Sequence, residues 1–405
     1  MRVKGDLTKG IDWKDFIPAL IIVVNSLTWN IFMLSVFSSA INSLKISSAT
    51  TLLLFSIEFM SIGVSAILGS RFFPSSRRTA LALWMAMGSL ASILVITIPN
   101  NGLLMNLLVC AFFGSSIGAG LPSALASFAD ATTLENRGFF GGVTFAFVSL
   151  SSTFFVAALV FFGGGIEIAV LTSWRLVGLI LFLATYETKK TNEGITAPSY
   201  SEILSRRDFG LYFLPWIMFC LINYIEAPLL AHLFGNLYNL MEFVEVALAG
   251  VFALMGGIIA DHSGRKRVVI IGFIVLGMGY AILSLTSGME AAGYVYSFLD
   301  SVAWGMFASV FFMALWGDLG RNSTKEKYYT LGGLPYLLAI FLSELVNSYV
   351  GMLSVSTAFS LASFFLFLAV VPLMYAPETL PEKKIRDREL RDYLEKAKRA
   401  REKYT

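Results

Sequence analysis

The sequence predicts an all-α integral membrane protein in which twelve transmembrane helices form two pseudo-symmetric six-helix bundles. Three observations predict this fold class: an apolar composition, basic residues in alternate gaps between apolar runs, and an internal duplication. Hydrophobic residues make up 56% of the 405 residues and charged residues only 14%, with a mean hydropathy of +0.73. A soluble protein of this length would lack enough polar residues to cover its surface.

The apolar runs are long enough to cross a bilayer, because a hydrocarbon core about 30 Å thick requires ~20 helical residues. Runs of this length recur along the chain, and the expected spans are 16-38, 50-69, 79-98, 102-128, 139-162, 166-185, 209-234, 237-260, 268-287, 292-315, 331-352 and 355-374. The segment before the first span has no small-residue cleavage site, so we expect that span to be retained rather than removed as a signal peptide.

The basic residues predict how the chain is oriented. Twenty-eight of the thirty Lys and Arg residues fall in alternate gaps between the spans, and Lys45 and Arg175 are the exceptions. Basic segments stay on the cytoplasmic side during insertion, where anionic lipids also attract them. We therefore expect a multi-pass protein of the cell membrane with both termini in the cytoplasm.

A duplication divides the chain into two halves. Five pairs of residues share a separation of 188 positions: Gly69 and Gly257, Arg77 and Arg265, Arg78 and Lys266, Asp130 and Asp318, Arg137 and Lys325. Two parallel six-helix bundles related by an axis along the membrane normal are a known plan among transporters. The duplication therefore predicts this arrangement.

The duplication and the polar segments predict four domains: an N-terminal bundle (1-185), a linker (186-208), a C-terminal bundle (209-375) and a charged tail (376-405). In the linker, Ser199 stands three residues before Glu202, which predicts a capping box and a short cytoplasmic surface helix. In the tail, acidic residues precede basic ones by four positions, which favours a helix. That helix is either solvated or held on anionic lipid by its apolar side chains.

Five acidic residues lie well inside the predicted spans: Glu58, Glu226, Glu245, Asp300 and Glu344. An ionisable group inside hydrocarbon costs roughly 2.5–3.5 kcal/mol on insertion scales, so its placement indicates a function. Burial penalises the charged form of a carboxyl, which allows the group to bind and release a proton near neutral pH. Proton coupling is therefore the predicted role, and a structural hydrogen bond to a neighbouring helix is the alternative.

Glu226 is the strongest single candidate, because Asn223 lies three residues before it and Pro228 bends the same helix. Asn25 and Trp29 share a face of the first span, where they either hold a ligand or pack against a neighbouring helix. Arg175 has two interpretations. We prefer that it reaches the outer interface, and the alternative places it in mid-membrane against an acid, where it could hold an anionic substrate.

The segment GGIIADHSGRKRVVI places charges and glycines around the end of the eighth span, and Asp261 and Arg265 lie four residues apart on one side of the turn. An Asp at such a position can accept hydrogen bonds from the start of a neighbouring helix and can pair with an adjacent Arg. Rupture of this cluster would accompany rocking of the two halves. The alternative is that the basic residues only set the topology.

This segment, at this position within a half, resembles the signature of the major facilitator superfamily of secondary transporters. The first-half copy is degraded, with Phe73 and Ser76 where the family has Asp and Gly. The resemblance implies that spans 3, 6, 9 and 12 are peripheral and that all five buried acids face a central cavity. The expected conformational gate comprises Gly257, Asp261, Gly264, Arg265, Lys266, Arg77, Arg78, Asp130, Arg137 and Asp318.

The predicted function is secondary active transport of a small organic solute by alternating access, with proton symport as the coupling mode. The alternative is a proton-coupled exporter of drugs or metabolites, although span 5 lacks the Gly-Pro-Gly-Gly run typical of the family's antiporters. An enzyme is not expected, because no nucleophile, base and orienting group are placed together. The expected partners are the solute, protons and the lipid bilayer, with no nucleic acid, cofactor or metal, and the expected state is a monomer.

Overall fold

The computed structural model describes residues 10–162, 166–187, 197–286, 288–321, 323–347, 354–380, 390, 393 and 394. Within these residues the chain is helical and contains no strand. The tail helix expected over 376-405 lies for the most part outside the described residues.

The first half begins with long helices separated by short turns. Its helices are α2 (Trp13–Asn42), α3 (Ser48–Phe72), α4 (Arg77–Val95), α5 (Leu103–Gly118), α6 (Leu121–Ala131), α7 (Arg137–Phe162) and α8 (Glu167–Thr185), with the 3-10 turns η1 (Phe73–Ser76) and η2 (Ile98–Asn100). The short helix α9 (Tyr200–Ser205) follows. The predicted capping box is present there: Glu202 N donates to Ser199 Oγ at 3.1 Å, and Ser199 N donates to Glu202 Oε2 at 3.3 Å.

The second half repeats this order of helices. They are α10 (Arg207–Phe234), α11 (Asn236–Ser263), α12 (Arg265–Leu285), α13 (Glu290–Phe307), the π-helical segment η3 (Ala308–Leu315), α14 (Trp316–Leu319), α15 (Glu326–Asn347), α16 (Val355–Leu368) and α17 (Val370–Tyr375). Eleven helical stretches of the described residues are long and apolar enough to span a membrane. One of them, Ser48–Val95, has 48 residues and contains both α3 and α4, so it accounts for two of the twelve predicted crossings.

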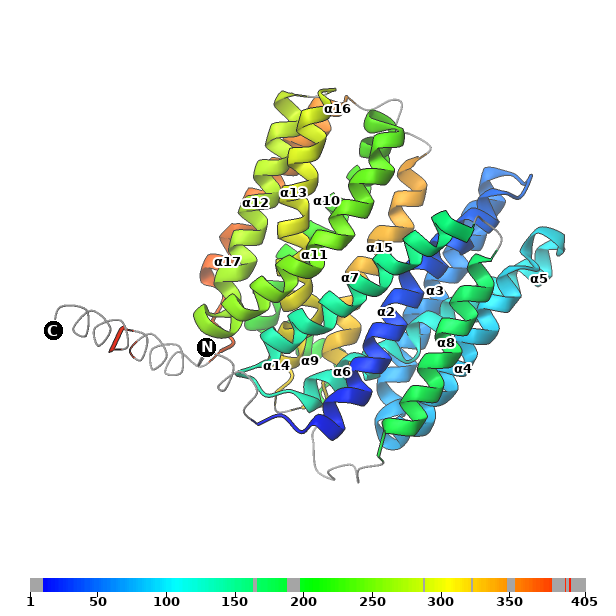
Figure 1. Cartoon of the computed structure of the whole chain (residues 1–405), viewed down its shortest axis with the longest axis horizontal. Helices are drawn as coiled ribbons and strands as arrows, with labels where there is room; N and C mark the ends of the chain where they lie inside the picture. The colour runs from blue at the N-terminus through cyan, green and yellow to red at the C-terminus, as the bar shows by residue number, and fades with distance from the viewer. Residues whose placement is uncertain are drawn as a thin grey trace.

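The helix packing shows the predicted pseudo-symmetry (Figure 1). In the first half α3 packs on α5 and α4 packs on α8, and in the second half their counterparts α11 on α13 and α12 on α16 do the same. Across the halves, α7 packs on α11 and α15 packs on α3, which are again equivalent pairs. The halves also meet where α7 packs on η3 and where α15 packs on α6. The fold is therefore the predicted one, two six-helix bundles.

Glycine allows the closest of these approaches between the halves. A Cβ atom added at Gly257 of α11 would lie 2.2 Å from the carbonyl oxygen of Gly138 in α7. One added at Gly142 would lie 2.3 Å from the carbonyl oxygen of Ala253. Small residues are what allow two membrane helices to touch through their backbones. The signature glycine therefore serves the contact between the halves.

Candidate functional site

Charged residues of both halves meet at one end of the bundle, where α6 ends and α7, α12 and α15 begin. We call them the ionic cluster, and its members are Arg77, Asp130, Arg137, Asp261, Arg265, Asp318, Lys325 and Glu326. Six of the eight are among the predicted gate residues. The cluster joins the halves in three places.

The first junction is formed by Asp261 at the end of α11. Its Oδ1 accepts a hydrogen bond from Gly138 N at 2.9 Å, and its Oδ2 accepts one from Phe139 N at 2.6 Å. These N–H groups lie in the first turn of α7, where a helix has unpaired donors and a positive dipole end. The carboxylate is buried and therefore caps a helix of the other half away from water.

The second junction is a fully buried network around Asp318. Arg265 donates from Nη1 to Asp261 at 2.5 Å, from Nε to Asp318 Oδ2 at 3.2 Å, and from Nη2 to the carbonyl oxygen of Leu134 at 2.8 Å. Arg137 of the first half pairs with the other oxygen of Asp318. Two arginines from different halves thus share one carboxylate.

The third junction repeats this pattern with the halves exchanged. Arg77 pairs with Asp130 at 2.7 Å, and Lys325 from the second half pairs with the other oxygen of Asp130. Arg77 also pairs with Glu326 of the second half. The two remaining basic residues of the predicted gate bind within their own halves instead. Arg78 donates to the carbonyl oxygen of Leu183 at 3.1 Å, and Lys266 donates to that of Met374 at 2.7 Å.

Three contributors lie outside the predicted gate, Lys325, Glu326 and Glu378. Glu378 accepts hydrogen bonds from Arg265 N at 2.9 Å and Lys266 N at 3.1 Å, so it caps the first turn of α12. Gly264 permits this contact: its φ is +100°, and a Cβ there would lie 2.4 Å from the Glu378 carboxylate. A sequence signal for Glu326 did exist. It lies 188 residues after Gly138, so it occupies the equivalent position in the second half and lies beside the signature segment of the first half.

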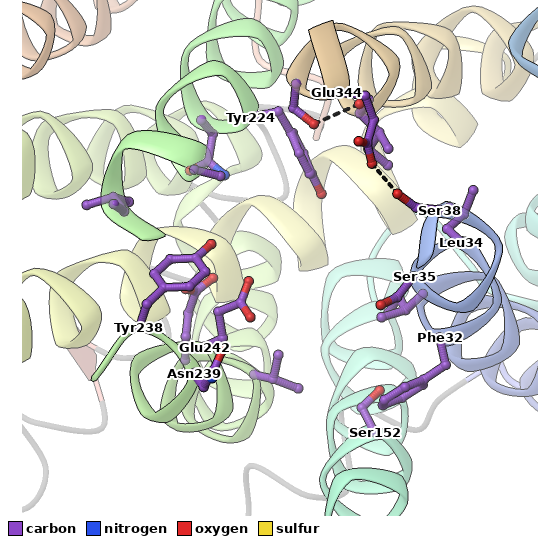
Figure 2. A pocket seen from close by; sticks show the side chains of 18 of the residues that line it. Phe32, Leu34, Ser35, Ser38, Ser152, Tyr224, Tyr238, Asn239, Glu242 and Glu344 are labelled. Atoms are coloured by element: carbon purple, nitrogen blue, oxygen red, sulfur yellow. Dashed lines mark hydrogen bonds between the residues drawn. The ribbon is translucent and has the colours of Figure 1, made fainter. Parts of the chain in front are cut away.

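A cavity of about 1140 Å³ lies between the halves, toward the end opposite the ionic cluster. Its wall comes from α2, α3 and α7 of one half and α10, α11, α13 and α15 of the other. A smaller cavity of about 290 Å³ shares part of this wall and extends toward the cluster as far as Tyr329 and Thr330. In Figure 2 Glu344 points across the cavity to Ser38, while Tyr238 and Glu242 project from the facing wall.

The structure places four of the five predicted acids on the cavity wall: Glu58, Glu245, Asp300 and Glu344. Asn223 also lines the cavity, and its Oδ1 has no hydrogen-bond partner. Glu226, the strongest sequence candidate, is 7% exposed with Oε2 unpartnered, and it lies outside the residues that line the cavity. Glu242 forms part of the wall, although its sequence position suggested no role.

The acids on the wall act on one another through their charges. Glu245 and Asp300, from α11 and α13, lie close enough on the wall for their charges to interact. Glu344 accepts a hydrogen bond from Ser38 Oγ at 2.5 Å, and its charge acts on Glu58 of the other half. Two neighbouring carboxylates repel each other, so a proton on one of them stabilises the pair. The wall therefore offers a place where a proton can be held.

Arg175 does not reach the outer interface, so our preferred interpretation was wrong, and the arginine is fully buried. Its guanidinium lies 4.9 Å from the ring centre of Trp29 and 4.4 Å from that of Trp84. It donates to Asn25 Oδ1 at 3.1 Å and to Ser26 Oγ at 2.6 Å. The described residues form no ion pair with it. Aromatic faces and neutral oxygens, rather than an acid, hold the cation here.

Asn25 and Trp29 are occupied by the same packing. Asn25 Nδ2 donates to the carbonyl oxygen of Trp174 at 2.7 Å, and Trp29 Nε1 donates to Ser92 Oγ at 2.9 Å. Neither residue lines the large cavity. Their geometry agrees with the packing alternative rather than with a ligand site.

No family model matches the chain. A segment of 147 residues is 25% identical to the enterobactin exporter EntS of Shigella flexneri, and it covers 34% of this chain and 36% of that exporter. The match therefore spans about a third of the relative's length.

Several solved structures resemble the whole chain. FucP, a Major Facilitator Superfamily transporter in the outward conformation, has a TM-score of 0.69 at 10% identity, over 90% of this chain and 98% of that one. The proton:xylose symporter XylE, bound to 6-bromo-6-deoxy-D-glucose, has a TM-score of 0.68 at 13% identity, over 90% and 96%. The human organic anion transporter MFSD10 has a TM-score of 0.65 at 14% identity, over 89% and 98%. This chain has the fold of the major facilitator superfamily.

Proposed function

We propose that the chain is a secondary active transporter that moves a small organic solute across the cell membrane by alternating access, coupled to protons. One observation carries the proposal: a cavity of about 1140 Å³ between two pseudo-symmetric bundles, at the end opposite a closed ionic cluster. A cavity walled by both bundles changes its exposure when the bundles rock.

In the proposed cycle the described state is closed at the cytoplasmic end and has its cavity on the outer side. Both termini then lie in the cytoplasm, as the basic residues predict. Closure depends on contacts that cross the halves, above all Asp261 with the start of α7 and Arg137 with Asp318. Rocking must break these contacts and form others at the outer end. One monomer contains all the parts that this cycle requires.

We assign proton binding to the acids of the wall, first to the pair of Glu245 and Asp300. The repulsion between their charges favours a proton on one of them, and both lie in the second half. Glu58 and Glu344 interact across the halves, so their protonation would change the repulsion between α3 and α15. Glu226 and Asn223 extend this polar region from α10.

Symport is the coupling mode that we propose first, and proton-coupled export is the second candidate. One observation favours export, the local match to an exporter. The direction of the coupled flux separates the two candidates.

The test is transport in proteoliposomes under an imposed pH gradient, screened over sugars, carboxylates, amino acids and organic cations. Accumulation in vesicles with an alkaline interior supports symport, and extrusion in exchange for protons supports export. Asp300→Asn and Glu226→Gln should each abolish accumulation driven by the gradient while solute exchange without a gradient persists. Glu290→Gln, an exposed change on the same helix as Asp300, is the control. Gradient-driven accumulation that survives both variants would remove these acids from coupling.

A further inference from the structure

The charge of the cavity wall has one sign. Among the described residues that line the large cavity, five are acidic and none is Lys, Arg or His: the acids are Glu58, Glu242, Glu245, Asp300 and Glu344. The part of the smaller cavity beyond this wall adds no basic residue. Nothing basic among these residues compensates a carboxyl that has lost its proton, so each deprotonation gives the wall a negative potential. Walls of one charge in a low-dielectric cleft concentrate ions of the opposite sign.

Aromatic rings stand next to these acids. Tyr224, Trp304 and Tyr336 line both cavities, and their ring centres lie 5.2–6.4 Å apart. The three ring planes stand at 85–89° to one another, so they form a corner. The charge of Glu245 acts on Tyr224, which places an acid beside this aromatic corner. Rings around a carboxylate are the usual setting for an organic cation, because the ring faces carry negative charge density.

The same features disfavour an organic anion and leave few long amide side chains for a sugar. An organic anion would need a basic group on the wall, and Arg175, the buried arginine away from the ionic cluster, is enclosed by Trp29 and Trp84. A sugar needs many directed hydrogen bonds, while this chain has no Gln at all. The wall does carry three Asn and eight Ser or Thr side chains, so a cation is favoured by its five acids, its ring faces and the lack of a basic residue among the described lining residues.

We propose that the cavity binds a lipophilic organic cation, such as a protonated amine or quaternary ammonium with an apolar body, between the aromatic corner and the Glu245–Asp300 pair. This inference names the substrate class and therefore rests on the proposed transport function. The cation and a proton use the same two carboxyls, so binding of one releases the other. Such competition belongs to proton-coupled export, the second candidate of the proposed function, so a cation substrate favours export over symport.

The test compares two probes that share a shape and differ in the sign of their charge, tetraphenylphosphonium and tetraphenylborate. Binding of each to the purified full-length protein in detergent micelles is measured calorimetrically, with protein-free micelles subtracted. Tetraphenylphosphonium should bind saturably and at least about ten-fold more tightly, a difference of roughly 1.4 kcal/mol. Equal or tighter binding of tetraphenylborate, or no saturable binding of tetraphenylphosphonium, overturns the proposal.

Variants locate the site. The double change Glu245→Gln and Asp300→Asn should weaken tetraphenylphosphonium binding about ten-fold or more, while Glu290→Gln leaves it unchanged. Trp304→Phe should retain most of the affinity and Trp304→Leu should lose it, because only the first keeps a ring face. Unchanged affinity in the folded double variant overturns the assignment of the site. If that variant does not fold, the comparison of the two probes on the unaltered protein still decides the substrate class.

The outcomes separate this inference from the proposed function. Gradient-driven transport of a sugar or carboxylate, without saturable binding of tetraphenylphosphonium, refutes the substrate class and leaves transport standing. Saturable, carboxyl-dependent binding of tetraphenylphosphonium without any exchange across proteoliposomes supports the cation site and refutes transport.

Discussion

The two copies of the signature surround their arginines with acids in different ways. Arg265 pairs with Asp261 and Asp318, both from its own half. Arg77, its counterpart, pairs with Asp130 from its own half and with Glu326 from the other. Phe73 stands 188 residues before Asp261, so the first copy lacks that acid. Each arginine nevertheless has two carboxylate partners.

The difference teaches how a lost acid can be replaced from across an interface. Glu326 lies 188 residues after Gly138, so the two residues occupy equivalent positions in the two halves. Gly138 stands at the start of α7 and Glu326 at the start of α15, and each of these helices faces the signature segment of the opposite half. In the second copy the acid belongs to the signature and caps the facing helix through Gly138 N and Phe139 N. In the first copy the acid belongs to the facing helix and reaches back to Arg77. Each arginine therefore still has two carboxylate partners. The contact between the halves is a helix cap in the second copy and an ion pair in the first.

The junctions of Asp261 and Asp318, which share Arg265, also differ from the Arg77 junction in their exposure to water. The side chains of Arg265 and Asp318 are 0% exposed, whereas those of Arg77 and Asp130 are 22% and 43% exposed. Removing one partner of a buried ion pair leaves an uncompensated charge, while exposed pairs contribute little. We therefore expect the Asp261 junction to hold the closed state more strongly than the Arg77 junction.

Asp261→Asn should have the largest effect. It removes a buried partner of Arg265 and weakens the cap on α7, and losses of this kind cost about 3–5 kcal/mol. The measurement is maleimide labelling of Ala129→Cys, a buried position that faces Gly317 of the other half. Labelling should accelerate ten-fold or more. Cys110 and Cys220 are buried and should contribute little background, and an unchanged labelling rate would show that this junction does not hold the halves together.

Glu326→Gln should have a smaller effect in the same assay. Arg77 is partly exposed and keeps Asp130, so water and one carboxylate still compensate its charge. The expected cost is about 1 kcal/mol, seen as a labelling rate a few-fold above that of the parent. An increase as large as that of Asp261→Asn would contradict the ranking of the two junctions.

Phe73→Asp in a Glu326→Gly background should restore closure. The double variant gives the first copy the residues that the second copy has, an acid in the signature and glycine at the start of the facing helix. Labelling should return most of the way to the parent rate, with the two positions coupled by roughly 0.5–3 kcal/mol in a double-mutant cycle. If the two changes affect the labelling rate additively, the two copies of the signature are not equivalent.

The sequence predicted the features that depend on pattern along the chain. Apolar run lengths gave the twelve crossings, and the 188-residue separation gave the equivalence of the halves and most of the ionic cluster. The role of Glu326 depends on which helix ends meet in space. The sequence of one segment does not contain that information. The same holds for Glu242, because its place on the wall depends on how α11 is rotated.

Two further features depend on packing rather than on composition. Arg175 is held by the rings of Trp29 and Trp84, which come from other helices, so local sequence suggested an interfacial residue instead. The π-helical segment Ala308–Leu315 lies between Asp300 in the cavity and Asp318 in the ionic cluster. Such segments often mark functional sites, and no residue pattern within this segment distinguishes it from an ordinary apolar helix.

Salt should have the smallest effect and should act on one junction alone. Between about 0.01 M and 1 M salt the Debye length falls from about 30 Å to about 3 Å, which screens exposed charges and leaves buried pairs nearly unaffected. The Asp261→Asn variant keeps the buried pair of Arg137 and Asp318. It depends more, however, on the partly exposed junction of Arg77, Asp130 and Lys325, so its labelling rate should rise a further two-fold or so at high salt. The Glu326→Gln variant keeps every buried contact of Asp261 and Asp318, so its rate should change less. Equal salt dependence in both variants would mean that water reaches the two junctions alike, and the difference in their strength would need another cause.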